Sequence, residues 1–159
     1  SPWPPLSSND GLARHHYPEP QPAELVAAMA KYYGVAADQV LVGRGSDEGI
    51  DLLTRAFCRA QQDSIVVCPP TFGMYAVAAA IQGARTVSIP LRENFRLDVS
   101  AILAALQSAN SNPPKLIWLC SPNNPTGNTL GREDIEAVLA AASGRAVVVV
   151  DSLTSAKNS

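Results

Sequence analysis

Residues 145–151 read RAVVVVD, a run of four valines that ends in a carboxylate. Continuous apolar runs of this kind are typical of strands in a sheet that is covered on both faces. Similar runs stand at 64–68 (SIVVC) and at 115–120 (KLIWLC). The sequence therefore predicts buried, parallel strands at these three places.

Segments with a helical spacing of apolar residues separate the strands. We expect helices over residues 21–33, 47–59, 73–82, 99–106 and 132–142, with further short strands at 40–42 and 85–89. Strands that alternate with helices indicate βαβ units. The predicted fold class is therefore α/β, a three-layer α/β/α domain with a mostly parallel sheet.

The composition fits one folded domain and excludes some classes of protein. The chain has 159 residues, 47% of them hydrophobic, which is enough for one sizeable core. Its net charge is −2, so no basic field favours nucleic acid or an anionic membrane. No apolar stretch reaches the roughly 18 residues of a transmembrane helix, and the start lacks a signal sequence. We expect neither a nucleic-acid partner nor a membrane partner.

The cysteines indicate a reducing compartment. Cys58, Cys68 and Cys120 cannot all pair with one another, and no CxxC motif or Cys/His cluster suggests a metal site. Free thiols are typical of proteins in a reducing cytoplasm. We therefore expect a cytoplasmic protein without a metal.

Polar motifs fall in the loops that follow predicted strands, where ligands bind in sheets of this type. In GRGSDE (43–48) the N–H groups of a helix start could hold a phosphate, although Ser46 or Asp47 could equally be a simple N-cap. In CPPTFGMY (68–75) the ring of Phe72 could stack on a flat heterocycle, or it could pack in the core.

Two further motifs follow the later strands. In SPNNPTG (121–127) two prolines fix the backbone, so the amide of Asn124 has a defined direction; a plain turn is the alternative. Asp151 ends the four-valine strand, where its carboxylate could pair with a cationic ring nitrogen or cap a following helix.

In this order the four motifs resemble the large domain of fold-type I pyridoxal-phosphate (PLP) enzymes, the aspartate aminotransferase superfamily. With HYPEP at 16–20, the set is similar to the histidinol-phosphate aminotransferase branch of that superfamily. The resemblance covers residues 1–151. It implies an N-terminal arm at 1–20, part of the PLP-binding large domain at 21–151 and an atypical tail at 152–159. We expect a truncated chain without the family's small C-terminal domain.

The resemblance also implies roles for single residues. Ser46 and Asp47 would offer backbone N–H groups to the cofactor phosphate, and Phe72 would stack on the pyridine ring. Asn124 would form a hydrogen bond with the 3-oxygen of the ring. Asp151 would pair with the protonated pyridine nitrogen, which keeps the ring an electron sink.

The active sites of this family lie at a homodimer interface, so we expect a homodimer. Tyr17 would reach the cofactor phosphate of the partner subunit. Trp3 would lie near the substrate entrance. His16 stands where the family usually has an arginine.

The Schiff-base lysine that the family needs is not evident. The chain has three lysines, Lys31, Lys115 and Lys157. We expect Lys31 on a solvated helix and Lys115 at the wrong end of a strand, while Lys157 matches the family's Ser-Lys signature only loosely. Relatives continue past the aspartate with Glu-Ala-Tyr, whereas Asp151 is followed by Ser-Leu-Thr. We therefore expect the catalytic lysine to be missing and residues 152–159 to be foreign sequence.

The resemblance implies an aminotransferase of histidine biosynthesis. Through PLP it would convert L-histidinol phosphate and 2-oxoglutarate into imidazole-acetol phosphate and glutamate. Two alternatives stay open: a PLP enzyme like the threonine-phosphate decarboxylases, or a non-catalytic, truncated module that binds PLP or a phosphate. Without its lysine, the chain as given is expected to be inactive.

Overall fold

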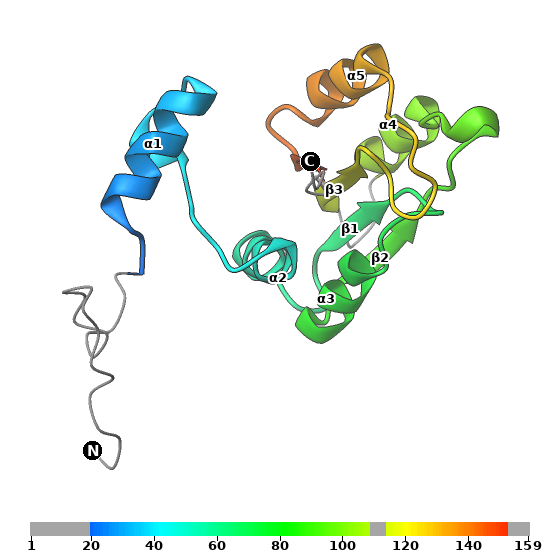
Figure 1. The fold of residues 1–159 in the computed structure, drawn as a ribbon. Coiled ribbons are helices and arrows are strands. Elements are labelled where there is room, and N and C mark those ends of the chain that lie inside the picture. The colour runs from blue at the N-terminus through cyan, green and yellow to red at the C-terminus, as the bar shows by residue number, and fades with distance from the viewer. Residues whose placement is uncertain (1–19, 109–113, 153–159) are drawn as a thin grey trace, which may run out of the picture. The chain divides into compact units, whose positions relative to one another are not determined.

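The computed structural model describes residues 20–108 and 114–152 of the chain. They belong to two compact units, residues 1–43 and residues 44–159. The second unit contains the sheet and the helices that cover it (Figure 1). No helix in the described ranges is long and apolar enough to cross a membrane.

In the first unit the described residues form one α-helix and one short 3-10 helix. These are α1 (Ala23–Tyr33) and η1 (Ala37–Gln39). The predicted strand at 40–42 is wrong. The backbone N–H of Val42 donates to Oε1 of Gln21 at 2.8 Å, and its carbonyl accepts from Nε2 of the same side chain at 2.8 Å. An amide side chain thus satisfies the backbone groups that a neighbouring strand would otherwise pair with.

Within the described residues, the second unit is built on a parallel sheet of four strands in the order β2-β1-β3-β4. The strands are β1 (Ser64–Val67), β2 (Arg85–Ser88), β3 (Pro114–Cys120) and β4 (Val147–Asp151). Each neighbouring pair is parallel, so the carboxyl ends of the strands meet at one edge of the sheet. The predicted α/β class with a parallel sheet is confirmed.

Helices cover both faces of this sheet and complete the three layers. One face carries α2 (Ser46–Phe57) and α3 (Met74–Gln82), and the other carries α4 (Val99–Gln107) and α5 (Arg132–Ala142). Successive residues of β3 alternate between the two hydrophobic cores, as the pleat of a strand requires. The chain therefore buries both faces of its central strands.

Local signals set the helix ends. Asp98 caps α4, because its carboxylate accepts the backbone N–H of Ala101 at 3.0 Å and a bond from the guanidinium of Arg92 at 2.8 Å. A short 3-10 helix, η2 (Glu93–Phe95), lies between Arg92 and Asp98. At the end of α3, Gly83 adopts a left-handed conformation (φ 74°), which a residue without Cβ tolerates.

β4 is an edge strand of the described sheet, which differs from the burial on both faces predicted for its four valines. The residues of β1 are all buried, whereas three valines of β4 are half-buried and the fourth, Val150, is 46% exposed. In the described chain β4 pairs with β3 alone. Asp151 therefore stands at the end of a strand that is supported from one side.

Candidate functional site

At the strand ends, the carboxylate of Asp151 meets the phenol of Tyr75. The Tyr75 hydroxyl donates a hydrogen bond to Asp151 Oδ2 at 2.7 Å. Tyr75 lies in the first turn of α3 and is 0% exposed, while Asp151 is half-buried. Burial, and after it the bond to Asp151, raises the pKa of Tyr75 far above its usual range. The phenol therefore stays protonated and acts as a hydrogen-bond donor.

Phe72 belongs to the same cluster of aromatic rings. Its ring meets that of Tyr75 edge-on, with the centroids 5.7 Å apart and the planes at 84°. Tyr75 in turn stacks flat on Trp118 of β3, with a centroid distance of 4.8 Å and 9° between the planes. Phe72 is half-buried, so it contributes to the core and still presents surface to solvent. The structure thus brings two predicted site residues, Phe72 and Asp151, to one buried phenol.

The SPNNPTG loop lies against the loop that follows β1. Asn123, 5% exposed, donates through Nδ2 to the carbonyl of Pro70 at 2.7 Å and to Oγ1 of Thr126 at 2.6 Å. Asn124, the predicted ring contact, is exposed. The two neighbouring asparagines therefore differ in role: Asn123 fixes the shape of the loop, and Asn124 presents its amide to solvent.

Ser46 and Asp47 open α2, and both are exposed. Residues 58–63 separate the end of α2 from the start of β1. Neither residue is the N-cap, because Gly45 holds that position with φ 114°, a conformation that favours glycine. A glycine cap has no side chain to accept the first N–H groups, which stay open to a ligand.

The remaining candidates are placed elsewhere. Trp3, His16, Tyr17 and Lys157 lie outside the described residues. Lys31 is exposed in the last turn of α1, in the first unit. Lys115 is the second residue of β3, at the opposite end of that strand from Cys120. Lys115 therefore does not lie with Asp151 at the edge where the strands end.

Sequence reasoning missed two residues that hold this site together, Tyr75 and Asn123. Each sits within a motif that was recognised, and each is buried. For Tyr75 no local pattern gives a signal, because Phe72, three residues earlier, lies before the start of α3 at Met74. For Asn123 the available signal was an amide flanked by a proline in a loop that follows a strand.

These parts suit a flat ligand with a cationic ring nitrogen and an anionic group. A carboxylate favours the cation, an aromatic side chain favours the ring face, and open N–H groups at a helix start favour a phosphate. The described residues contain no group of three or more His, Cys, Asp or Glu side chains that could hold a metal ion. The chemistry of this donor set matches the non-covalent requirements of PLP.

A parallel, three-layer α/β domain with these groups after its strands is the architecture of PLP-dependent transferases of fold type I. The sequence profile of aminotransferase class I and II matches residues 6–153, and the chain belongs to this family.

Individual proteins of this kind are also similar to the chain. The chain is 50% identical over 137 residues to the histidinol-phosphate aminotransferase of Yersinia enterocolitica, covering 86% of this chain and 35% of that protein. Histidinol-phosphate aminotransferase from Sinorhizobium meliloti in complex with pyridoxal-5'-phosphate superposes with a TM-score of 0.74 at 24% identity, over 85% of this chain and 35% of that one. Alanine aminotransferase from Pyrococcus furiosus gives a TM-score of 0.75 at 22% identity, over 86% and 36%. The chain spans about a third of the length of the curated relatives it matches.

Proposed function

We propose that the chain is the cofactor-binding part of a PLP-dependent histidinol-phosphate aminotransferase. The observation that carries this proposal is the 50% identity to the Yersinia enterocolitica enzyme over 86% of the chain. A match that spans 137 of the 159 residues includes the motifs at 43–48, 68–75 and 121–127. The threonine-phosphate decarboxylase alternative stays open and is tested by the products that the whole protein forms.

Residues at the strand ends and at the start of α2 would together hold PLP. Asp151 would hold the ring nitrogen, Phe72 the ring face and Asn124 the 3-oxygen. The backbone N–H groups of Ser46 and Asp47 would hold the phosphate. Bound PLP supplies an electron sink for bonds at the substrate's Cα.

The whole protein would transfer the amino group of L-histidinol phosphate to 2-oxoglutarate, giving imidazole-acetol phosphate and glutamate in the cytoplasm. It would act as a homodimer, in which Tyr17 of the partner subunit reaches the cofactor phosphate and Trp3 lies near the substrate entrance. The apolar edge of β4, with Val150 46% exposed, is consistent with a domain that needs further chain or a second subunit to cover it.

For the 159-residue chain by itself we propose non-covalent binding of PLP without turnover. Lys115 lies at the opposite end of β3 from the candidate site, which supports this view. Lys157 lies outside the described residues and is the lysine to test directly.

The experiment titrates the chain with PLP and follows the absorbance of the bound cofactor. We expect saturable binding, and Asp151→Asn should weaken it by about tenfold or more, because a hydrogen bond to a charged group is lost. Asp51→Asn, at a partly exposed carboxylate on α2, is the matched control and should leave binding unchanged. Equal affinities for Asp151→Asn and the control would contradict the proposed site.

Two further measurements test the reaction. Borohydride treatment of the chain with PLP should leave no covalent adduct, and an adduct that disappears in Lys157→Ala would instead make Lys157 the covalent anchor. A longer protein that carries this sequence should form glutamate from L-histidinol phosphate and 2-oxoglutarate. Release of carbon dioxide from L-threonine phosphate, without glutamate formation, would favour the decarboxylase.

A further inference from the structure

Tyr75 touches both of the groups that would face the cofactor ring, but it has no role in the function proposed above. Its hydroxyl bonds the carboxylate of Asp151 at 2.7 Å, and its ring edge meets Phe72 with the centroids 5.7 Å apart. We propose that Tyr75 is a positioning residue, which aims the Asp151 carboxylate at the ring nitrogen of the cofactor and sets it relative to Phe72. This inference rests on the proposed PLP site.

The core fixes the hydroxyl of Tyr75 in space. The ring is 0% exposed and lies flat on Trp118 at 4.8 Å, and Trp118 itself is 1% exposed. A fully buried ring that is stacked on a second buried ring has little room to change its rotamer. The position of the hydroxyl oxygen is therefore set by α3 and β3 and not by a loop.

Asp151 needs such an anchor because of its place in the sheet. It is the last residue of β4, a strand that pairs on one side only in the described chain. Its backbone carbonyl accepts the N–H of Ser121 at 2.8 Å, which holds the main chain but leaves the side chain free to rotate. The bond from Tyr75 to Oδ2 supplies the missing constraint on the carboxylate.

The chemistry of the bond leaves Asp151 able to bind a ligand. A carboxylate has about four acceptor sites on its two oxygens, and a phenol supplies a single donor to one of them. Because the donor is neutral, it orients the carboxylate without cancelling its charge. A charged acceptor with capacity to spare is what a protonated ring nitrogen requires.

The first test uses the chain without cofactor, with aspartate labelled with carbon-13 at the side-chain carboxyl. The Asp151 signal is identified by its loss in Asp151→Asn. We expect Tyr75→Phe, which keeps the stacked ring, to shift this signal, and Tyr32→Phe, at an 84% exposed tyrosine, to leave it in place. If Tyr75→Phe does not fold, the Cζ signal of Tyr75 is followed in Asp151→Asn, where it should shift. An unmoved signal in either measurement overturns the proposal.

The second test compares PLP with its 1-deaza analogue, which has a carbon in place of the ring nitrogen. The wild-type chain should bind PLP more tightly than the analogue. In Tyr75→Phe we expect this ratio of affinities to fall by about fivefold, the worth of one ordinary hydrogen bond, while the affinity for the analogue stays the same. A purely structural loss would weaken both ligands equally and leave the ratio unchanged, which would overturn the proposal. Failure of the wild-type chain to bind PLP counts against the proposed function, whereas the carboxyl signal alone decides whether Tyr75 holds Asp151.

Discussion

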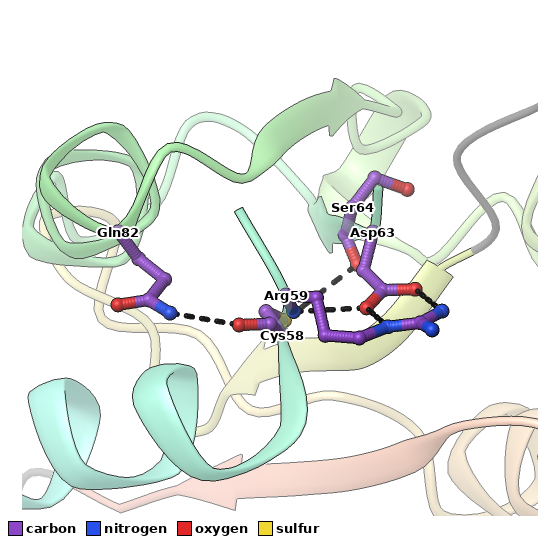
Figure 2. A network of polar contacts seen from close by, with 5 residues as sticks. All are labelled: Cys58, Arg59, Asp63, Ser64 and Gln82. Atoms are coloured by element: carbon purple, nitrogen blue, oxygen red, sulfur yellow. Dashed lines mark hydrogen bonds and ion pairs between the residues drawn. The ribbon is translucent and has the colours of Figure 1, made fainter. Parts of the chain in front are cut away.

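The turn between α2 and β1 contains an ion pair with a buried carboxylate, and removal of this pair should destabilise the fold (Figure 2). Asp63 is 1% exposed and accepts three hydrogen bonds from Arg59: from the backbone N–H at 2.8 Å, from Nε at 2.8 Å and from Nη2 at 3.1 Å. Gln82 of α3 bonds the carbonyl of the adjacent Cys58 at 2.9 Å, so the same turn is tied to a second helix. We predict that Asp63→Ala destabilises the turn that leads into β1.

The expected loss of stability depends on which of the two side chains is buried. Arg59 is 67% exposed and regains water when the pair is broken, so the guanidinium contributes little. The backbone N–H of Arg59 loses a charged acceptor, and a hydrogen bond to a charged group is worth about 1.5–3 kcal/mol. We expect Asp63→Ala to lower the free energy of unfolding by about 2–3 kcal/mol, and Asp63→Asn, which keeps an acceptor, by less. For a chain of this size, 2–3 kcal/mol corresponds to a fall in Tm of about 5–10 °C.

A second ion pair, on α2, is a matched control. Arg55 and Asp51 are also four residues apart and bond at 3.0 Å, and Arg55 is 61% exposed, but the carboxylate is 43% exposed instead of 1%. Surface pairs of this spacing are worth about 0.3–0.5 kcal/mol, so Asp51→Ala should barely change stability. Thermal and urea unfolding followed by circular dichroism measures both variants. Equal losses in Asp63→Ala and Asp51→Ala would refute the reasoning from burial.

The stabilisation of the fold by the Arg59–Asp63 pair should depend on pH. The hydrogen bond from Arg59 lowers the pKa of Asp63 in the folded chain. A carboxylate with a lowered pKa stabilises the fold fully above its unfolded value of about 3.9, and this contribution is lost as the pH falls through the folded value. The difference in Tm between wild type and Asp63→Ala should therefore be full at pH 7 and shrink below about pH 4. A constant difference down to pH 2 would show that lost packing, not charge, is responsible.

Three further changes have defined outcomes. Asp98→Ala should lower the urea midpoint at neutral pH. Arg92 lowers the pKa of Asp98 to about 2, so the difference in midpoint between wild type and variant should close as the pH falls from about 4 toward 2. Burial raises the pKa of Cys58 to about 11 and that of Cys68 to about 12, so neither thiol should react with iodoacetamide at pH 8 until the chain unfolds; rapid labelling of the native chain would contradict this. Asn123→Ala should cost about 1–3 kcal/mol because two hydrogen bonds of a buried amide are lost, whereas Asn124→Ala, at an exposed neighbour, should stay within about 0.5 kcal/mol; urea unfolding compares the two.

The sequence predicted the regular elements well where apolar pattern and burial agree. The predicted helix at 132–142 has the observed bounds of α5, and the strand predicted at 115–120 differs from β3 by one residue. The failure at 40–42 has a physical cause, since three apolar residues have strand propensity but form a strand only when a neighbour supplies backbone partners. Here Gln21, about twenty positions away, takes those hydrogen bonds, and no local pattern reveals that.

Some residues of the candidate site can likewise be predicted from the local sequence, whereas others depend on tertiary contacts. Aromatic and polar side chains at the end of an apolar strand, or in the loop that follows one, stand out in the sequence. This is why the sequence predicts Phe72, Asn124 and Asp151 as ligand contacts. Tyr75 does not stand out, because a tyrosine in an alanine-rich helix has the pattern of a core residue. Its partner is 76 positions away, and their meeting depends on the pairing of β3 with β4 and on the packing of α3 over Trp118.

In a parallel sheet the crossover helices bring residues from distant parts of the sequence to the strand ends. The residues that would touch a ligand can therefore be recognised from local sequence motifs. Tyr75, which orients Asp151, is instead placed by tertiary packing. Among related sequences, substitutions at Tyr75 should consequently accompany substitutions in the buried ring cluster and not substitutions in the polar loops.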